Sequence, residues 1–428
     1  MKHLLTVLFH TWSAAFDCPG GGEIQLLQYE KHLIKLGIRV LRYDPWNPQF
    51  DQVDLVHHFS SQPDILFCDY VSKRKELPLV ISSIFWPEQK NKYNIDQIGN
   101  LYRLASKILP NSHMECELLS ALLNIPEKQF TPIVNGVDES YFNPVSPDFF
   151  RNTYGITGNF VLCMGNIEAR KNQLRLIEAL RGTGTQLVLA GQEREVDYAA
   201  LCHQAAETTV HFIGKLKQGS ILQQSAYAAA QALVLPSILE TPGLVALEAA
   251  ASGTPRLVLT NVGCTQEYFA DHATYLNPDE PESIRDAVLA ALACPVSSDT
   301  LRTYVKKNFT WSRAAEQLAD VYQQVIQEHC SKPQNHSETK YVHQPVAKKE
   351  IYLPRNIPSS HDFVHLSGEK KTFFRSPEVI LPAGSYIANL TYSFLGPIIP
   401  PKVVLHDTQR GDIASTDLKQ GIRQTLQL

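Results

Sequence analysis

The feature that most constrains the fold of this chain is an alternation of two kinds of segment, from its start to about residue 330. Short apolar runs rich in Val, Ile and Leu alternate with longer segments in which apolar residues recur at helical spacing. Such alternation is typical of parallel β-sheets built from strand–helix–strand units. The sequence therefore predicts an α/β fold class, and its 428 residues leave room for two or three domains.

The first half of the alternation is expected to form an N-terminal Rossmann-like domain over residues 1–150. An amphipathic helix is predicted from about Gly22 to Leu36, because Gly37 follows it as a helix terminator. A second helix is expected over Ser112–Leu123. The predicted strands are Leu4–Phe9, Arg39–Tyr43, Asp54–His58, Ile65–Cys68, Leu79–Ile84 and Lys107–Pro110.

The second half repeats this plan, so residues 151–310 are expected to form a second Rossmann-like domain. Helical segments such as Asn172–Leu180 and Gly219–Ala230 follow its strands. The predicted strands are Phe160–Met164, Gln186–Ala190, Val210–Ile213, Ala232–Leu235 and Leu257–Leu259. Two successive doubly wound domains place a cleft between them, at the carboxyl ends of both sheets, where small ligands bind.

The composition changes near the C-terminus. Trp311–His329 is a long amphipathic helix, and we expect residues 311–330 to pack back on the N-terminal domain. Residues 331–350 are polar and are expected to be a linker. Residues 351–428 alternate apolar and polar positions and predict a small β-rich module, either an appendage or the front of a longer chain. Its predicted strands are Phe363–Leu366, Thr372–Phe374, Glu378–Leu381, Tyr386–Phe394 and Lys402–His406.

Charge and cysteine usage exclude several classes of protein. The chain carries 39 Lys and Arg against 43 Asp and Glu, so it lacks the basic excess that binds nucleic acids. Its eight cysteines are scattered without a C-x-x-C pair, which is typical of buried thiols in a reducing compartment. No apolar run approaches the roughly 18 residues of a transmembrane helix. We therefore expect a cytoplasmic protein, and peripheral contact with the inner membrane face stays open.

The residues most suggestive of chemistry lie in the sequence ALVLPSILETPGLVALEAAASGTPRLVLTNVGCTQEYF, from Ala232 to Phe269. Glu240 follows a predicted buried strand, and a helix is expected to begin at Gly243. The free N–H groups at that helix start, on Gly243, Leu244 and Val245, would form an anion site suited to a diphosphate. Glu248, farther along the helix, could accept hydrogen bonds from both hydroxyls of a ribose. Glu240 could also be a carboxylate that only stabilises the helix dipole.

These residues resemble a family, the retaining glycosyltransferases of family four (glycosyl transferases group 1), which have the two-domain GT-B fold. The similarity is strong over residues 157–295 and weak over 1–110. It rests on the Glu240-x7-Glu248 spacing, Ala251–Pro255, Gly263–Glu267, Gly165–Asn172, Asn135–Asp138 and Gly20–Gly22.

The resemblance implies roles for individual residues. The catalytic candidates are Glu240, Lys171 and Arg170, and the donor-binding candidates are Gly21, Gly22, Gly165, Asn166, Gly243, Leu244, Val245 and Glu248. Cations and oriented amides would stabilise the charge that grows on a departing nucleoside diphosphate. Consecutive cations at a helix start are also often merely solvated, and a glycine run can be a flexible turn.

The sequence departs from the family at two places. Asn166 stands where an arginine commonly follows the glycine of the diphosphate loop. The predicted strand Leu79–Ile84 is not followed by the histidine that contacts the transferred sugar in the family. Trp86, Glu88 and His58 are the candidates for the acceptor or sugar side. Trp86 could equally be a rim aromatic, and His58 a satisfied structural residue at a strand end.

The resemblance thus implies an enzyme, a retaining glycosyltransferase that moves a hexosyl unit from a nucleotide-diphosphate sugar to a hydroxyl acceptor. The acceptor would be a glycan, a lipid-linked glycan or a small molecule. We expect no cofactor and no metal, because the donor region has no Asp-x-Asp motif. Two alternatives stay open, a nucleotide-sugar epimerase of similar fold and a non-catalytic sugar-binding or scaffold protein.

Overall fold

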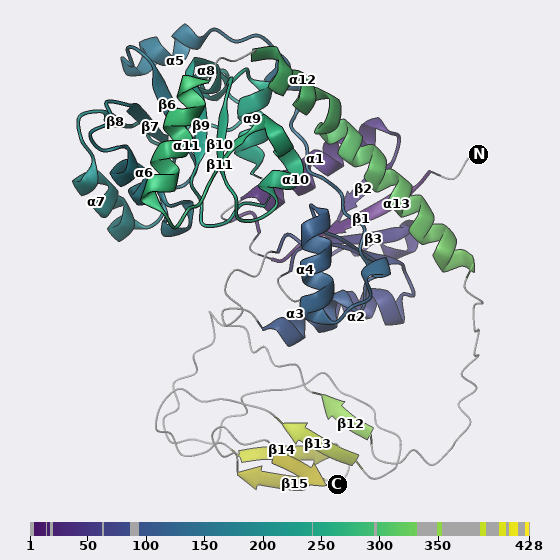
Figure 1. Cartoon of the computed structure of the whole chain (residues 1–428). Coiled ribbons are helices and arrows are strands. Elements are labelled where there is room, and N and C mark those ends of the chain that lie inside the picture. Colours follow the sequence, from purple (N-terminus) through teal and green to yellow (C-terminus); the bar gives the residue numbers. More distant parts are fainter. Residues whose placement is uncertain are drawn as a thin grey trace. The chain divides into compact units, whose positions relative to one another are not determined.

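The computed structural model describes residues 4–13, 15–17, 20–61, 64–85, 94–241, 243–294 and 298–331, and five strands between 349 and 427 (Figure 1). The chain divides into two compact units, Met1–Pro333 and Gln334–Leu428. The first unit contains two parallel sheets, each with helices on both faces. Among the helices of the described residues, none is long and apolar enough to cross a membrane.

The first sheet is parallel throughout and has the strand order β2-β1-β3-β4-β5. Its strands are β1 Thr6–His10, β2 Arg39–Arg42, β3 Leu55–Phe59, β4 Leu79–Ser82 and β5 Lys107–Leu109. The helices of this domain include α1 Gly21–Lys35, α3 Ile95–Tyr102 and α4 His113–Leu123. Every residue of β1, β3 and β4 is buried, because helices cover both faces of the sheet.

One predicted strand of this domain is wrong. Ile65–Cys68 is helical and belongs to α2, Ile65–Asp69. The Asp64 side chain caps this helix by accepting a hydrogen bond from the Phe67 N–H at 3.3 Å. A run of four apolar residues is too short to show whether its period is that of a strand or of a helix. The side-chain cap at Asp64 favours the helix here.

The second sheet is also parallel and has the order β11-β10-β9-β6-β7-β8. Its strands are β6 Phe160–Met164, β7 Gln186–Ala190, β8 Val210–Phe212, β9 Ala232–Leu235, β10 Leu257–Thr260 and β11 Thr274–Leu276. Its helices are α5 Pro147–Tyr154, α6 Gln173–Leu180, α7 Val196–Ala205, α8 Ile221–Ala229, α9 Leu244–Ala251, α10 Thr265–Phe269, α11 Pro281–Ala293 and α12 Ser298–Asn308. The prediction of two Rossmann-like α/β domains is confirmed.

The last helix of the unit, α13 Trp311–Ser331, returns to the first domain and lies along α1 (Figure 1). Trp311, Leu318 and Tyr322 are fully buried in one core with residues of β1 and α1. The Tyr322 hydroxyl also lies 2.6 Å from His57 Nδ1 in β3. The first domain is therefore completed by a helix that follows the second in sequence.

The second unit contains two small sheets. Strands β12 Lys349–Tyr352, β13 Tyr386–Leu390 and β16 Gln424–Gln427 form one, and β14 Lys402–Asp407 pairs antiparallel with β15 Gly411–Asp417 in the other. β12 begins inside the segment expected to be a linker. The predicted strands Phe363–Leu366, Thr372–Phe374 and Glu378–Leu381 lie outside the described residues, so the β-rich module stays a prediction.

Candidate functional site

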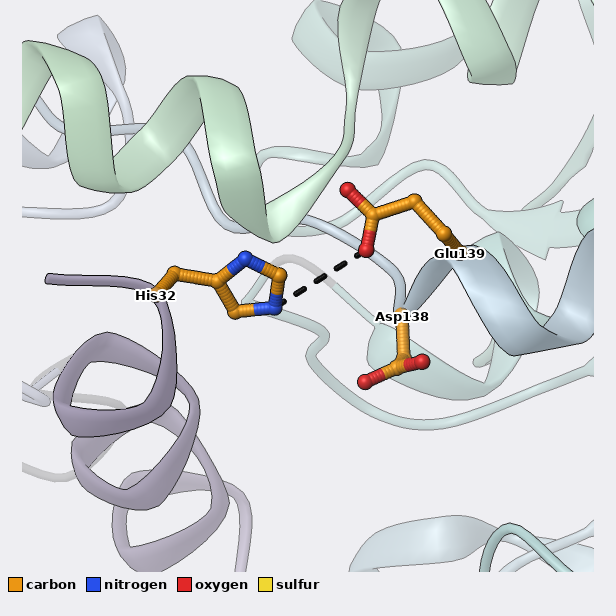
Figure 2. Close-up of side chains that lie close together, drawn as sticks. All are labelled: His32, Asp138 and Glu139. Carbon is orange, nitrogen blue, oxygen red and sulfur yellow. Dashed lines mark ion pairs between the residues drawn. The ribbon is translucent and has the colours of Figure 1, made fainter. Parts of the chain in front are cut away.

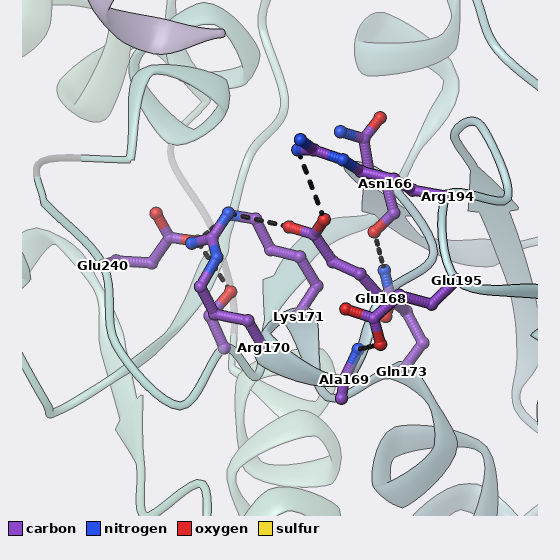
Figure 3. A network of polar contacts seen from close by, with 10 residues as sticks. Asn166, Glu168, Ala169, Arg170, Lys171, Gln173, Arg194, Glu195 and Glu240 are labelled. Carbon is purple, nitrogen blue, oxygen red and sulfur yellow. Dashed lines mark hydrogen bonds and ion pairs between the residues drawn. The ribbon is translucent and has the colours of Figure 1, made fainter. Parts of the chain in front are cut away.

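Two loops meet at the carboxyl edge of the second sheet. One follows β6 and contains Gly165–Lys171, and the other follows β9 and leads to α9. Because β6 and β9 are neighbours in the parallel sheet, these loops lie side by side. Their polar side chains, together with Arg194 and Glu195 of the segment after β7, form the network in Figure 3.

The centre of the network is an ion pair between Lys171 and Glu240. Lys171 Nζ contacts Glu240 Oε1, and the Ser237 hydroxyl donates to the same oxygen at 2.6 Å. Burial raises the pKa of the Glu240 carboxyl, but Lys171, Ser237 and Arg170 together outweigh it and lower the pKa. Glu240 is therefore an ionised carboxylate at neutral pH, although only 5% of its surface is exposed.

The backbone of Glu240 is held by the loop that follows β10. The Glu240 N–H donates to the Val262 carbonyl at 3.2 Å, and the Cys264 N–H donates to the Glu240 carbonyl at 3.1 Å. Gly263, between these partners, has a φ of +99°, and a Cβ there would lie 2.1 Å from the Glu240 carbonyl oxygen. A glycine is thus needed for the two loops to approach this closely.

The loop that carries Lys171 is fixed at both ends. Asn172 Nδ2 donates to the carbonyls of Pro236 and Pro278, at 3.0 and 2.8 Å. Gln173 Nε2 donates to the Asn166 carbonyl at 2.7 Å (Figure 3). These contacts tie the start of α6 to the segments that follow β9 and β11, so Lys171 reaches Glu240 from a rigid support.

Arg170 is oriented by a second buried carboxylate. Glu168 is 5% exposed and accepts a hydrogen bond from Arg170 Nη2 at 2.9 Å. Its other oxygen lies 3.7 Å from Arg194 Nη1 (Figure 3). The Arg170 guanidinium is half exposed and contributes to the lowered pKa of Glu240.

The start of α9 lies next to the Glu240 side chain. Gly243 caps the helix with a φ of +73°, and a Cβ there would lie 3.7 Å from Glu240 Oε2. The Ala246 N–H makes the first hydrogen bond of this turn, to the Gly243 carbonyl at 2.8 Å. The N–H groups of Gly243, Leu244 and Val245 precede it and form a helix N-terminus that favours anions.

Glu248 lies one turn farther along the same helix. Its carboxylate accepts hydrogen bonds from the Tyr227 hydroxyl at 2.9 Å and from Gln218 Nε2 at 3.1 Å. Burial raises the pKa of Glu248, against the effect of these hydrogen bonds. Glu248 lines a cavity of about 280 Å³ together with Gln218, Leu244, and residues of α1 and of the segment Gly136–Tyr141. The cavity lies between the two domains.

The glycine-rich start of α1 faces the start of α9 across this interface. A Cβ on Gly21 would lie 3.8 Å from Leu244 Cδ1, and Leu244 packs against the cores of both domains. A Cβ on Gly22 would lie 3.0 Å from the side chain of Ile84. Ile84 has a φ of +37°, which is strained for a β-branched residue.

Comparison with known proteins gives a family match in the second domain. The sequence model of the family described as glycosyl transferases group 1 matches residues 148–309. Residues 148–309 are therefore similar to this glycosyltransferase family. The match contains Lys171, Glu240 and Glu248.

The chain is also similar to curated and solved glycosyltransferases. It is 28% identical over 266 residues to an uncharacterized glycosyltransferase of Methanocaldococcus jannaschii, covering 53% of this chain and 66% of the relative. It is 32% identical over 176 residues to glycogen synthase of Mycobacterium tuberculosis, covering 38% of this chain and 42% of that enzyme. The chain thus spans less than two thirds of the length of these curated relatives.

The fold is shared with the Anabaena protein HepE, solved in complex with UDP and glucose. The TM-score is 0.62 at 18% identity, over 75% of this chain and all of HepE. This likeness, together with the family match, confirms the GT-B fold that the sequence predicted.

The structure brings together the candidate residues predicted in the second domain, and the start of α1, which contains Gly21 and Gly22, faces Leu244 among them. His58 is not part of this assembly. It is fully buried in β3, its ring stacks on His10, and the two Nδ1 atoms lie 2.8 Å apart. Trp86 and Glu88 lie outside the described residues.

Several site residues were missed by the sequence analysis. They are the side chains that hold the predicted ones, namely Glu168, Asn172, Arg194, Gln218, Tyr227 and Ser237. Ser237 lies three residues before Glu240, and this proximity was the only available signal. Tyr227 reaches Glu248 from α8, and Gln218 reaches it from the loop before α8. No local sequence pattern indicates these contacts.

Proposed function

We propose that the chain is a retaining glycosyltransferase, which moves a hexosyl unit from a nucleotide-diphosphate sugar to a hydroxyl acceptor. One observation carries the proposal. Lys171 pairs with Glu240 beside the N-terminus of α9, so a cation and free N–H groups converge within the domain matched by the family. This is the arrangement that a departing diphosphate needs.

Donor binding would use two parts of the site, the start of α9 with Lys171 for the diphosphate and Glu248 for the ribose. The diphosphate would accept hydrogen bonds from the N–H groups at the start of α9 and would face the Lys171 ammonium. Glu248 would accept hydrogen bonds from the two ribose hydroxyls, because it lines the interdomain cavity and is already oriented by Tyr227 and Gln218. The solved complexes of HepE with UDP and with UDP-glucose support a nucleotide sugar as the ligand class.

In the proposed reaction, the bond between sugar C1 and the diphosphate oxygen breaks while the acceptor oxygen forms a bond to C1 on the same face. The acceptor proton passes to the departing diphosphate. The interaction of Lys171 with the diphosphate would strengthen as negative charge develops there. Glu240 would position the sugar and stabilise its positive charge. These cationic and N–H groups could neutralise the diphosphate without a metal ion.

The acceptor is expected on the first domain, where the start of α1 faces Ile84. The strained Ile84 backbone lies in the loop after β4, at the carboxyl edge of the first sheet. Strained backbone is common at functional sites, which supports a role for this loop in sugar or acceptor recognition. The sugar and acceptor classes follow from the family resemblance.

Turnover of the full-length chain tests the proposal. We would screen UDP-, GDP- and ADP-sugars with simple glycoside and lipid-linked acceptors and measure nucleoside diphosphate release. The expected result is acceptor-dependent release and a glycoside with the anomeric configuration of the donor, read by NMR. Conversion of the donor sugar without acceptor would instead support an epimerase. Absence of both turnover and nucleotide binding across the panel would contradict an enzymatic role.

A further inference from the structure

A cluster of three side chains lies outside the proposed donor site. His32, in the last turn of α1, faces Asp138 and Glu139 at the start of the short helix Glu139–Phe142 (Figure 2). One ligand atom from each residue lies within 4.8 Å of the other two. The cluster therefore joins the first domain to the segment that leads into the second.

His32 is the buried member of the cluster. Its side chain is 2% exposed, and Nε2 has no hydrogen-bond partner among the described residues. Nε2 points toward Glu139 Oε2 at 3.8 Å (Figure 2). A buried ring nitrogen without a partner is unusual and calls for a ligand or an ion. Burial lowers the pKa of His32, so the ring is neutral at neutral pH, the form that binds metals.

The two carboxylates are held by neighbouring groups. Asp138 accepts a hydrogen bond from the Ser140 N–H at 3.0 Å and pairs with Lys31, while Glu139 accepts from the Ser312 hydroxyl. Such outer contacts orient carboxylates in metal sites. Lys31 is half exposed and can leave Asp138, since it is a flexible side chain at the surface.

We propose that His32, Asp138 and Glu139 bind a divalent transition-metal ion, with Zn²⁺ as the best fit. One imidazole nitrogen and two carboxylate oxygens suit Zn²⁺, and water would complete the tetrahedron. The ion would replace the Lys31 ammonium on Asp138. The expectation of no metal, drawn from the sequence, concerned the diphosphate, and this site does not include Lys171, Glu240 or Glu248.

A bound ion would fasten α1 to the segment between the domains. α1 carries Gly21 and Gly22 at its other end, and Asp138 also lines the cavity that contains Glu248. The ion would thus act on the stability of the interdomain region and take no part in the transfer. The sequence could not indicate the cluster, because His32 and Asp138 are more than a hundred residues apart.

Zinc titration of the metal-stripped, full-length chain tests the site. We would use a background with Cys294→Ser and Cys330→Ser, because both thiols are exposed and thiolates are zinc ligands. A competing chelator gives the Kd, and thermal unfolding gives the shift in Tm. The expected result is one site whose Kd weakens by at least about 10- to 100-fold in His32→Gln and in Glu139→Gln, since loss of a second-shell partner already costs that much. Removing the competing cation in Lys31→Met should tighten binding.

The control is His203→Gln, which removes an exposed His–Glu pair with Glu193 at 2.8 Å and should leave the Kd unchanged. Unchanged zinc affinity in both His32→Gln and Glu139→Gln, or no high-affinity site in the starting protein, would overturn the proposal. If the His32 variant does not fold, Lys31→Met still tests the proposal. Weaker or unchanged zinc binding in Lys31→Met would contradict competition between Lys31 and the ion for Asp138. Nucleotide binding, measured on the same samples, tests the glycosyltransferase proposal separately.

Discussion

The carbonyl oxygen of Glu240 lies where a side chain on residue 263 would begin. We expect Gly263→Ala to displace Glu240 and to abolish transfer, because Cβ would lie 2.1 Å from that oxygen and φ is +99°. Gly253→Ala is a matched control, since its φ is +98° and its Cβ would meet nothing within 4 Å. Backbone strain alone costs about 1–2 kcal/mol, and Gly263→Ala should lose about twice that or more in urea unfolding. Equal losses in the two variants would show that the close approach is unimportant.

Glu248 provides a second test at the scale of one residue. Glu248→Gln should weaken binding of the cognate nucleoside diphosphate by about 10- to 100-fold, because a hydrogen bond to a charged group contributes about 1.5–3 kcal/mol. Calorimetry measures the affinity directly. Glu282→Gln, an exposed carboxylate at the start of α11, should leave it unchanged. Equal affinity of wild type and Glu248→Gln would remove Glu248 from the ribose.

The sequence predicted the residues that share one loop or helix, and it missed their supports. Glu240, Gly243 and Glu248 could be predicted as candidates because their spacing is local. Tyr227 reaches Glu248 from another helix, and this contact depends on packing that spacing does not reveal. His58 was named as a candidate for the acceptor or sugar side, and its burial agrees with the alternative, a structural role, although its partner His10 could not be foreseen.

At the scale of elements, the N-terminus of α4 contains a buried carboxyl that should make stability depend on pH. Burial raises the pKa of Glu115 to about 8, with Glu267 adding to the effect and the Asn111 N–H opposing it. Between about pH 4.5 and 8 the folded state holds a proton that the unfolded state has lost. The contribution of this carboxyl to the free energy of unfolding is therefore fully present below about pH 4.5, and it is lost as the pH rises through 8.

Glu115→Gln should remove this dependence. We compare the free energy of unfolding of wild type with that of the variant. The difference, wild type minus variant, should fall by at most about 1.4 kcal/mol per pH unit between pH 5 and 8. Urea unfolding at a series of pH values measures it. Glu117→Gln, exposed on the same helix, should follow wild type at every pH. A pH-independent difference between wild type and Glu115→Gln would show that the carboxyl is ionised in the fold.

Elements were predictable where their patterns were long. The helix expected over Gly22–Leu36 is α1, because fifteen residues and a terminating glycine give a clear period. Ile65–Cys68 was misassigned and β11 was not recognised, since three or four residues carry too little pattern. In both cases neighbouring structure decides the conformation.

At the scale of the whole molecule, Glu267 and Tyr268 of the second domain contact the first domain outside the site. The Glu267 carboxylate accepts hydrogen bonds from the N–H groups of His113 and Met114, at 2.8 and 3.1 Å, and so caps α4 from the second domain. The Tyr268 hydroxyl donates to the Asn111 carbonyl at 2.6 Å. No sequence pattern indicates which loop of one domain meets which helix of the other.

Two truncations separate the roles of the C-terminal segments. A chain that ends at Ser331 should bind the nucleoside diphosphate as the full chain does, since every proposed donor contact precedes residue 270. A chain that ends at Thr310 lacks α13 and exposes the core around Leu318 and Tyr322. Each lost large side chain costs about 2–5 kcal/mol, so several exceed the stability of a typical domain and the first domain should unfold. Circular dichroism and calorimetry measure both outcomes, and an unfolded chain ending at Ser331 would contradict this division.

The most direct test of the proposed function is the steady-state kinetics of Lys171→Met with the cognate donor and acceptor. Lys171 should stabilise the departing diphosphate more than the bound donor, so kcat should fall by about 100-fold or more, which is about 2.7 kcal/mol, while KM changes little. Lys307→Met, an exposed lysine on α12, should retain both constants. A variant Lys171→Met that keeps the wild-type kcat and shows only a raised KM would contradict the proposed role of Lys171 in catalysis.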